Sequence, residues 1–435
     1  MHFSPLDASS PAPLRVGLLG LGTVGSGVHR LLRRNAGLIA RRAGRLVELR
    51  TIAARNVARA REVAGANAAI VDDAMAVATA PDIDVVVEAI GGSTVARDLV
   101  LAAIAHGKHV VTANKALLAL HGEEIVEAAS RQGVVVAFEG AVAVSIPIVK
   151  ALREGLAANE IAWLAGVVNG TSNFVLTQMR ERGVSFDEAL GEAQRLGYAE
   201  ADPSFDVDGI DSAHKLALLA SLAFGTPLDF AAIEVKGIRA LQLVDLAAAE
   251  RLGFRVKLLA CARRHGGKLN LRVEPALVPA SSLMAGVNGS MNGIVVHGDA
   301  CGPTMYHGAG AGSLETASAV VADLIDLARA AQAPAHCRAP ALGVTREQAR
   351  AMPRMASQAL VSPHYLRVSL GLDDVLRVLA SGNLSMAAHA DLHDDGVALI
   401  TQAAPRSAVQ EVIGLLEREP GIRAPVVWLP VESLR

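Results

Sequence analysis

The chain has 435 residues and a formal net charge of −2. It is too long for one ordinary hydrophobic core, which predicts two or three domains. Hydrophobic residues make up 51% of the chain and aromatic residues only 3%, a composition typical of helices packed on a parallel sheet. The near-neutral charge argues against a nucleic-acid-binding surface.

No segment has the pattern of a membrane span or a secretory signal. The uncharged stretch of residues 161–179 is interrupted by the polar run 169–173 and is a poor candidate for a span. Residues 1–13 lack a basic start followed by an apolar run, so we expect a flexible tail. The cysteines have no paired metal spacing, which fits a reducing compartment; they are Cys261, Cys301 and Cys337. We therefore expect a cytoplasmic protein.

An apolar run at residues 14–20 leads into a glycine-rich turn and then into a helical pattern through about Ala43. In this order of strand, turn and helix, the first glycines let backbone N–H groups approach a pyrophosphate, and Gly25 lets helix and strand pack closely. The turn consists of Gly20, Leu21, Gly22, Thr23, Val24 and Gly25. Further apolar runs, at 46–54, 84–90, 109–113 and 134–143, alternate with helical patterns. We predict a doubly wound parallel sheet, a Rossmann domain, over residues 14–147.

The end of the second apolar run bears on the choice of nicotinamide cofactor. An acid there would bind the ribose 2′-hydroxyl of NAD, but the chain has Ala53-Ala54-Arg55-Asn56. Arg55 suits a 2′-phosphate, so NADP(H) is favoured and NAD(H) remains open. A surface arginine in an arginine-rich chain is the competing interpretation.

Two lysines are informative because only seven of the 41 basic residues are lysines. Arginine stays protonated at neutral pH, whereas the pKa of a lysine can be lowered into a useful range. Lys115 follows Thr112 at the carboxyl end of a predicted parallel strand, the edge where such sheets bind ligands. Lys215 lies one turn after Asp211 in a predicted helix over residues 210–224. A solvated ion pair is the alternative interpretation of Asp211 and Lys215.

The remainder of the chain divides into a second domain, a linker and a small third domain. Residues 148–314 predict an antiparallel sheet with flanking helices and short alternating segments at 269–274 and 292–297. A glycine loop at 307–313 precedes a predicted helix over 315–330, which we expect to complete the Rossmann domain. Residues 331–362 are predicted to form a linker. Residues 363–435 have a βαββαβ pattern, with apolar runs at 364–370, 383–389, 396–401 and 425–430.

Five motifs resemble those of homoserine dehydrogenases in the same order over residues 14–330: GLGTVG at 20–25, TANKALL at 112–118, NGTSNF at 169–174, GYAEADPSFDVDGIDSAHK at 197–215 and GAGAGSLETAS at 308–318. The resemblance implies reversible NAD(P)H-dependent reduction of L-aspartate 4-semialdehyde to L-homoserine, in the biosynthesis of threonine, methionine and isoleucine. Only a short tail precedes the first strand, so we expect no upstream kinase domain. A related amino-acid dehydrogenase and a non-catalytic NADPH-bound sensor are the alternatives.

The resemblance also implies roles for individual residues. Lys215 would protonate the aldehyde oxygen as hydride arrives, with Lys115 beside the same oxygen. The substrate's ammonium group would bind Glu200 and Asp211. Its carboxylate end would bind the loop of Asn169, Gly170 and Thr171, and Asp206 belongs to the same predicted substrate site. Cofactor contacts are implied at the glycine turn and Arg55, and also at Thr94, Thr112, Lys115, Gly310, Gly312 and Glu315.

Members of the family also have a site for Na or K made largely of backbone carbonyls. In this chain it would comprise Glu139, Val142, Val144 and Ile146. Relatives usually place a small Ala/Gly pair where this chain has Val144-Ser145. A backbone angle there that only glycine adopts easily would therefore be strained.

Residues 363–435 resemble an ACT domain, a small fold that often binds amino acids at a paired interface. The usual loop has a glycine just before its valine, but here residues 371–375 read GLDDV. A threonine effector and a purely dimerising role for this domain therefore both remain open. A homodimer or homotetramer is expected from the family alone.

Overall fold

The structure is a computed structural model that describes residues 11–65, 68–330 and 338–434. Most of the expected tail, the beginning of the expected linker and Cys337 lie outside the described residues. The described chain divides into two compact units. The first unit comprises the described residues up to Asn159, together with Ala217–Ala231 and Ala309–Ala351. The second unit comprises Glu160–Leu216, Ala232–Gly308 and the described residues from 352 onward. Within these described ranges, no helix is long and apolar enough to cross a membrane.

The first unit contains the predicted Rossmann domain. Its sheet has six strands in the order β3-β2-β1-β4-β5-β6, and the pairs are parallel. The strands are β1 (Leu14–Leu19), β2 (Val47–Ala53), β3 (Ala69–Val71), β4 (Val85–Glu88), β5 (His109–Thr112) and β6 (Val136–Ala137). The helices between them are α1 (Thr23–Arg34), α2 (Ala36–Ala43), α3 (Val57–Ala64), α4 (Ala74–Thr79), α5 (Val95–Ala105) and α6 (Lys115–Gln132). The doubly wound fold class is confirmed.

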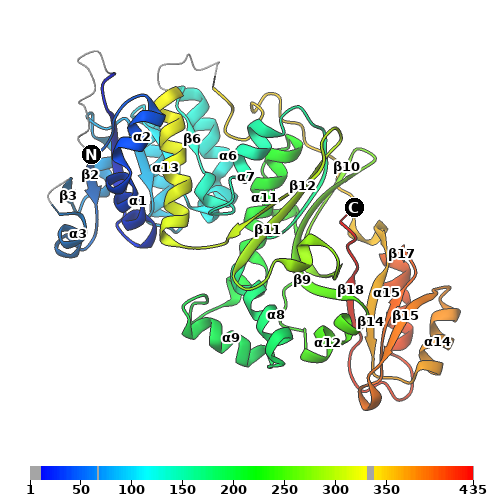
Figure 1. The fold of residues 1–435 in the computed structure, drawn as a ribbon. Helices are drawn as coiled ribbons and strands as arrows, with labels where there is room; N and C mark the ends of the chain where they lie inside the picture. The colour runs from blue at the N-terminus through cyan, green and yellow to red at the C-terminus, as the bar shows by residue number, and fades with distance from the viewer. Residues whose placement is uncertain (1–10, 66–67, 331–337, 435) are drawn as a thin grey trace. The chain divides into compact units, whose positions relative to one another are not determined.

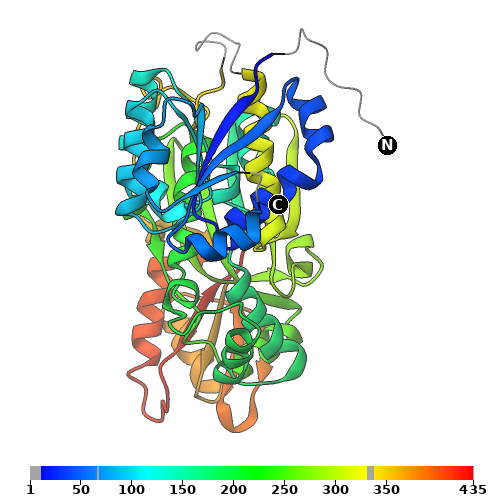
Figure 2. The ribbon, with the colours of Figure 1, turned by 90° about the vertical axis from the view of Figure 1, so that its left-hand side faces the viewer.

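A helix from much later in the chain completes this domain, as the sequence predicted. Helix α13 (Ser313–Ala330) begins two residues earlier than expected and lies beside α1 in both views (Figures 1 and 2). Its apolar residues recur at helical spacing and are buried in the same core as the apolar residues of β1; they include Ala317, Val320, Val321, Leu324, Leu327 and Ala328.

Several predicted boundaries in this unit are wrong. The expected strand over 134–143 is only two residues long, and a 3-10 turn, η1 (Glu139–Ala141), follows it. The buried carboxylate of Glu139 accepts hydrogen bonds from the backbone N–H groups of Val149 and Lys150, which holds the chain away from the sheet. The helical pattern through Ala43 breaks at Asn35 into α1 and α2. The 3-10 turn η1 is followed along the chain by α7 (Ile148–Lys150) and η2 (Ala151–Gly155).

The second unit contains the predicted sheet with flanking helices, in the order β12-β11-β7-β9-β10-β8. Its strands are β7 (Ile161–Val167), β8 (Glu234–Val235), β9 (Phe254–His265), β10 (Lys268–Pro279), β11 (Met291–Gly298) and β12 (Gly302–Ala309). The pairs β7–β9, β9–β10 and β7–β11 are antiparallel, whereas β8 joins β10 in parallel. The helices and turns are α8 (Gly170–Arg182), α9 (Phe186–Arg195), α10 (Ser204–Val207), α12 (Leu243–Arg251) and η4 (Leu283–Gly286). Helix α11 (Ile210–Phe224) begins in this unit, whereas its residues from Ala217 onward and most of η3 (Phe230–Ala232) belong to the first unit.

Helix α11 has the predicted bounds, but two other expectations for this region are wrong. The segment predicted at 269–274 belongs to the twelve-residue strand β10, whose residues are buried almost throughout and so do not alternate. The predicted glycine loop over 307–313 is shorter, because β12 continues through Ala309.

The predicted βαββαβ order is present in the last part of the chain. It consists of β14 (His364–Val368), α14 (Leu372–Ser381), β15 (Met386–Asp391), β16 (Val397–Thr401), α15 (Arg406–Leu416) and β18 (Val427–Pro430), with the sheet order β15-β16-β14-β18. Short elements complete it: η6 (Ser357–Ala359), β13 (Val361–Ser362), η7 (His393–Asp395) and β17 (Ala404–Pro405). Its identification as an ACT domain stays a prediction.

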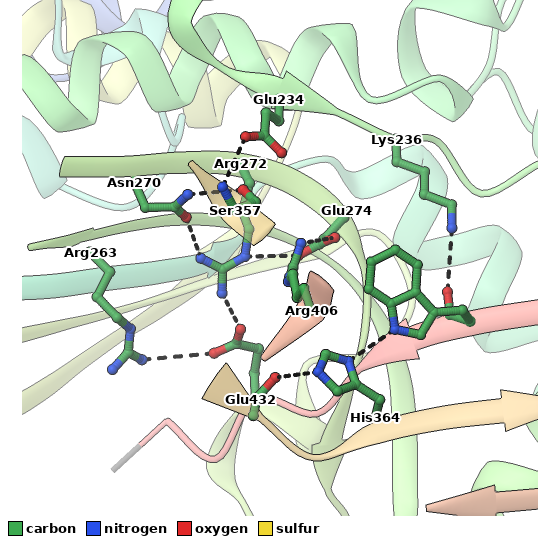
Figure 3. Close-up of polar contacts among 12 residues, drawn as sticks. Glu234, Lys236, Arg263, Asn270, Arg272, Glu274, Ser357, His364, Arg406 and Glu432 are labelled. Atoms are coloured by element: carbon green, nitrogen blue, oxygen red, sulfur yellow. Dashed lines mark hydrogen bonds and ion pairs between the residues drawn. The ribbon is translucent and has the colours of Figure 1, made fainter. Parts of the chain in front are cut away.

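Buried ion pairs join this last domain to strand β10 within the second unit (Figure 3). The guanidinium group of Arg272 donates to Glu274 at 2.8 Å and also to Glu432. Arg406, the first residue of α15, donates to Glu274 at 3.1 Å. Lys236 lies over the ring of Trp428, 5.6 Å from its centroid. The end of the predicted linker is therefore followed by a domain that is docked on the sheet by charged groups.

Candidate active site

A cavity of about 820 Å³ lies at the carboxyl ends of β1 and β2 in the first unit. Five predicted cofactor residues line it: Gly20, Leu21, Gly22, Thr23 and Arg55. Ligands bind at this edge of a doubly wound sheet. The cavity is large enough to hold a small molecule or a dinucleotide fragment.

The glycine turn has the geometry that a pyrophosphate site requires. Gly20 has a φ of +94°, and a Cβ atom on Gly25 would lie 2.0 Å from the carbonyl oxygen of Gly20. The close packing inferred for Gly25 from the sequence is therefore confirmed. Helix α1 has twelve residues, no acid in its first turn and no side-chain cap on its N-terminus at Gly22. Its first N–H groups and its dipole favour an anion in this cavity.

Arg55 is one of three arginines that line the cavity. Arg30, on α1, and Arg59, in the first turn of α3, were not identified from the sequence. The N-cap Asn56 accepts a hydrogen bond from the backbone N–H of Arg59 at 3.0 Å, which sets the start of α3 beside β2. One carboxylate, that of Asp72, also lines the cavity. Arg55 precedes the N-cap of α3, so helical spacing does not relate the two arginines, and no sequence pattern marked Arg59.

A buried carboxylate organises the loops that follow β4 and β5. Glu88 accepts a hydrogen bond from the hydroxyl of Thr112 at 2.6 Å and two at 2.9 Å from the backbone N–H groups of Ile90 and Gly91. Thr112 is buried and lies outside the cavity lining, so it supports these loops. Lys115 is half-buried at the start of α6, directly after the N-cap Asn114.

The predicted glycine loop reaches the cavity through its last residue, Ser313, which begins α13 and was not among the predicted cofactor residues. Ser313 lines the cavity, and its hydroxyl donates to the carbonyl oxygen of Thr23 at 2.6 Å. The carbonyl of Gly312 accepts from the hydroxyl of Thr316 at 2.7 Å and from its backbone N–H at 3.1 Å, at the start of α13. The predicted cofactor residues that do not line the cavity are Val24, Gly25, Thr94, Thr112, Lys115, Gly310, Gly312 and Glu315.

A buried polar cluster in the second unit brings together four of the predicted substrate and catalytic residues. The side-chain amide of Asn169 donates to Asp206 at 2.7 Å and to Asp211 at 2.8 Å. The ammonium group of Lys215 donates to Asp211 at 2.9 Å and to the carbonyl of Val168 at 2.6 Å. These side chains come from the N-cap of α8, from α10 and from α11.

Burial dominates the electrostatics of this cluster. Lys215 is 5% exposed and Asp211 is 3% exposed, so the alternative interpretation of a solvated pair is wrong. Burial raises the pKa of Asp206; the bond from Asn169 opposes the shift, and the negative charge of Asp211 adds to it. Two anions and one ammonium therefore share a site with little water, where charges interact strongly.

The other predicted substrate residues differ in their placement. The hydroxyl of Thr171 donates to the carbonyl of Tyr198 at 2.7 Å. A Cβ atom on Gly170 would lie 2.8 Å from the carbonyl oxygen of Ser290, so this position requires glycine. The side chain of Glu200 is exposed on the loop before α10 and outside the buried cluster. The structure thus groups Asn169, Asp206, Asp211 and Lys215 but leaves Glu200 apart.

The segment predicted to bind a monovalent cation contains a strained residue. Val144 has a φ of +55°, which costs a β-branched residue roughly 1–2 kcal/mol. The carbonyl of Ile146 accepts a hydrogen bond from Ile148 at 2.8 Å. Glu139 presents its carboxylate to the N–H groups of Val149 and Lys150, both at 2.9 Å. No group of three or more His, Cys, Asp or Glu side chains that could hold a metal occurs among the residues described.

Known proteins match the chain along nearly its whole length. A family model described as "Homoserine dehydrogenase, NAD binding domain" matches residues 20–139, and one described as "Homoserine dehydrogenase" matches residues 147–325. Homoserine dehydrogenase from Pseudomonas aeruginosa is 48% identical over 97% of this chain and 99% of that protein. The enzyme from Neisseria gonorrhoeae is 44% identical with the same coverage.

Solved structures agree with these matches. A homoserine dehydrogenase from Thiobacillus denitrificans has a TM-score of 0.92 and 48% identity, covering 98% of this chain and 99% of its own. A hyperthermophilic archaeal homoserine dehydrogenase solved in complex with NADPH has a TM-score of 0.63 and 25% identity, covering 72% of this chain and 97% of its own. The chain belongs to the homoserine dehydrogenase family, whose members are NAD(P)-dependent oxidoreductases that act on a CH–OH group.

Proposed function

We propose that Lys215 is the proton donor in the family's reaction, the reversible reduction of L-aspartate 4-semialdehyde to L-homoserine. The observation that carries this proposal is the buried cluster of Asn169, Asp211 and Lys215. A nicotinamide cofactor supplies the hydride when it is bound. Reduction of an aldehyde places negative charge on its oxygen, and a buried ammonium stabilises that charge and can donate the proton. The bonds to Asp211 and Val168 hold the ammonium from two elements.

Replacing Lys215 tests this role. Lys215→Met should lower kcat by about 100- to 10,000-fold while the Kd for NADPH stays unchanged, because the glycine turn is untouched. Lys268→Met, at an exposed lysine on β10, is the matched control for loss of one positive charge. Near wild-type turnover of a folded Lys215→Met protein would assign the proton to another group.

For the substrate, we propose that Asp206 and Asp211 attract its ammonium group and that the first turn of α8 binds its carboxylate. Helix α8 has thirteen residues and no acid in its first turn, so its N-terminus at Gly170 and Thr171 favours an anion. Glu200 is proposed to bind the ammonium group after movement of its exposed loop. Glu200→Gln should then raise the KM for the semialdehyde, and an unchanged KM would exclude the contact.

For the cofactor, the three arginines of the cavity support a preference for NADP(H) over NAD(H). The NADPH complex of the archaeal relative is consistent with this preference. Lys115 is proposed to lie beside the reacting oxygen. A positive charge at the N-terminus of a helix opposes its dipole, which supports a functional reason for this residue.

Na or K is proposed to bind the carbonyls of Glu139, Val142, Val144 and Ile146. The positive φ of Val144 supports the site, because strain persists where function requires it. Turnover that is equal in sodium, potassium and a bulky organic cation would exclude it.

Threonine is proposed as an effector bound by the last domain, with assembly as a homodimer or homotetramer in the cytoplasm. Inhibition curves with threonine and mass measurement in solution test these points.

A further inference from the structure

Asn173 belongs to the NGTSNF motif, yet no step proposed above uses it. Its side chain is 1% exposed, and its amide group donates to three backbone carbonyls, those of Val287, Gly289 and Met291, at 3.0, 2.9 and 3.1 Å. These carbonyls belong to one short loop, residues 287–290, and to the first residue of β11. A single side chain of α8 therefore holds the whole loop.

Lys257, on β9, holds the same loop from the sheet. Its ammonium group donates to the carbonyl of Val287 and to the side-chain oxygens of Asn173 and Asn288, both at 3.2 Å. Three acceptors match the three N–H groups of an ammonium. Lys257 is 2% exposed, and these hydrogen-bond partners carry no charge. Such burial is costly for a cation, so an apolar residue would be the stabilising choice if packing alone mattered.

The charged groups around Lys257 increase that cost. Burial, together with the positive charges of Arg180 and Arg255, lowers the pKa of Lys257 to about 7, against the opposing effect of Glu181. The lysine is thus kept where both desolvation and its neighbours oppose its charge. A functional role for its contacts with the 287–290 loop and Asn173 explains why a lysine occupies this position.

The 287–290 loop, which Asn173 and Lys257 hold, packs against the first turn of α8, the predicted substrate-binding turn. Only 2.8 Å would separate a Cβ on Gly170 from the carbonyl oxygen of Ser290, so the loop and the first turn of α8 are in close contact. Two turns further along α8, the hydroxyl of Thr177 accepts from the N–H of Gly289 at 3.0 Å. Movement of the loop would release Gly170 and, with it, the adjoining Asn169.

We infer that Lys257 and Asn173 are positioning residues that hold the 287–290 loop against the first turn of α8 and so set the geometry of the substrate site. This inference rests on the proposed substrate role of residues 169–171. Gly170 has no side chain that could anchor it, so contact with a rigid 287–290 loop is required to keep its backbone in place. Binding groups must be held within about half an ångström to be effective.

The substitution Lys257→Met tests the inference, with Lys268→Met as the control. Lys257→Met should raise the KM for L-aspartate 4-semialdehyde about tenfold, since small displacements of binding groups are costly. The Kd for NADPH, measured by fluorescence titration, should not change. A purely structural role would lower the folded fraction and hence the apparent kcat, but it would leave KM as in the wild type.

Asn288→Ala is a milder second variant at a half-buried loop residue. It removes the oxygen that accepts from Lys257 at 3.2 Å and from Arg180 at 3.3 Å, and it should raise KM about threefold. Wild-type KM in both variants would overturn the positioning role and leave the proposed function intact. A wild-type protein that does not oxidise NADPH with the semialdehyde would overturn both.

Discussion

At the scale of single residues, the pair of Asp211 and Lys215 carries most of the functional argument. The two lie one turn apart on α11, and a carboxyl–ammonium distance of 2.9 Å joins them. Desolvating both charges costs several kcal/mol per ion unless further hydrogen bonds compensate, and Asn169 and Val168 supply such bonds. A surface pair would need no such support. These contacts support the proposed use of the charge of Lys215 in the reaction.

Arg55 and Arg59 test the cofactor preference. Arg55→Ala should weaken NADPH binding by about 10- to 100-fold, the value of a hydrogen bond to a charged group, and leave NADH binding unchanged. Arg59→Ala should act in the same direction. Fluorescence titration with both cofactors measures the two dissociation constants. Arg50→Ala, at an exposed arginine of β2 outside the cavity lining, is the matched control. Equal losses for NADPH and NADH would contradict a 2′-phosphate contact.

At the scale of elements, the sequence predicted best where local pattern and tertiary environment agree. Helix 210–224 was found because Gly209 precedes a continuous helical pattern, and the glycine turn was found because an apolar run leads into it. Strand β9 was not predicted and strand β10 was predicted too short, because burial on both faces removes the alternation of polar and apolar residues that marks a strand. The expected strand after residue 134 fails because contacts made by Glu139, ten residues from Val149, override its apolar pattern.

The contact between α12 and β14 offers a test of the docking of the last domain. Asp245 is fully buried and accepts hydrogen bonds from Arg367 at 2.7 Å and from the hydroxyl of Tyr365 at 3.1 Å. Asp245→Ala should lower the free energy of unfolding by about 3–5 kcal/mol, because it leaves the guanidinium of Arg367 buried without its anion. Urea unfolding measures the change.

The control for that measurement is Asp374→Ala. Asp374 makes an exposed pair with Arg377 at 3.0 Å, and its loss should cost less than about 1 kcal/mol. Equal effects of the two substitutions would show that the buried pair contributes no more than a surface one.

His364, on β14, predicts a pH dependence of stability. The indole N–H of Trp428 donates to Nδ1 of His364 at 2.9 Å, which requires the neutral ring. Burial lowers the pKa of His364 to about 4, against about 6.5 in an unfolded chain. Between these values the unfolded state binds the proton and the folded state does not. Stability is therefore full above about pH 6.5 and falls as the pH is lowered towards 4.

His364→Gln removes this titration while keeping an acceptor for Trp428. The wild type should lose about 2 kcal/mol more than the variant between pH 7 and pH 5, measured by urea unfolding. His389→Gln, at an exposed histidine on β15, should behave as the wild type. Parallel pH profiles of the wild type and His364→Gln would contradict the assignment.

At the scale of the whole molecule, the chain combines residues that are distant in sequence. The motifs predicted Asn169, Asp211 and Lys215, and the structure brings them together. No sequence pattern indicated that Glu88 lies beside Thr112, Ser313 beside Thr23 or Lys257 beside Asn173. The last two pairs are separated by 290 and 84 residues. Nothing in the local pattern of either partner reports such a contact.

The ion pairs between β10 and the last domain also affect how an effector should be sought. Arg272 and Glu274 are buried and have partners in Glu432 and Arg406. A chain that ends at residue 345 would lose both partners, so reduced threonine inhibition of such a chain would not by itself locate the effector. Inhibition is better compared between the intact protein and a variant changed at the GLDDV loop of residues 371–375.

The most direct test of the account is the rate of NADPH oxidation by the purified protein with L-aspartate 4-semialdehyde, with NADH as the comparison. We expect rapid oxidation that favours NADPH and is lost in Lys215→Met. Bound NADPH without oxidation, or undiminished turnover in Lys215→Met, would contradict it.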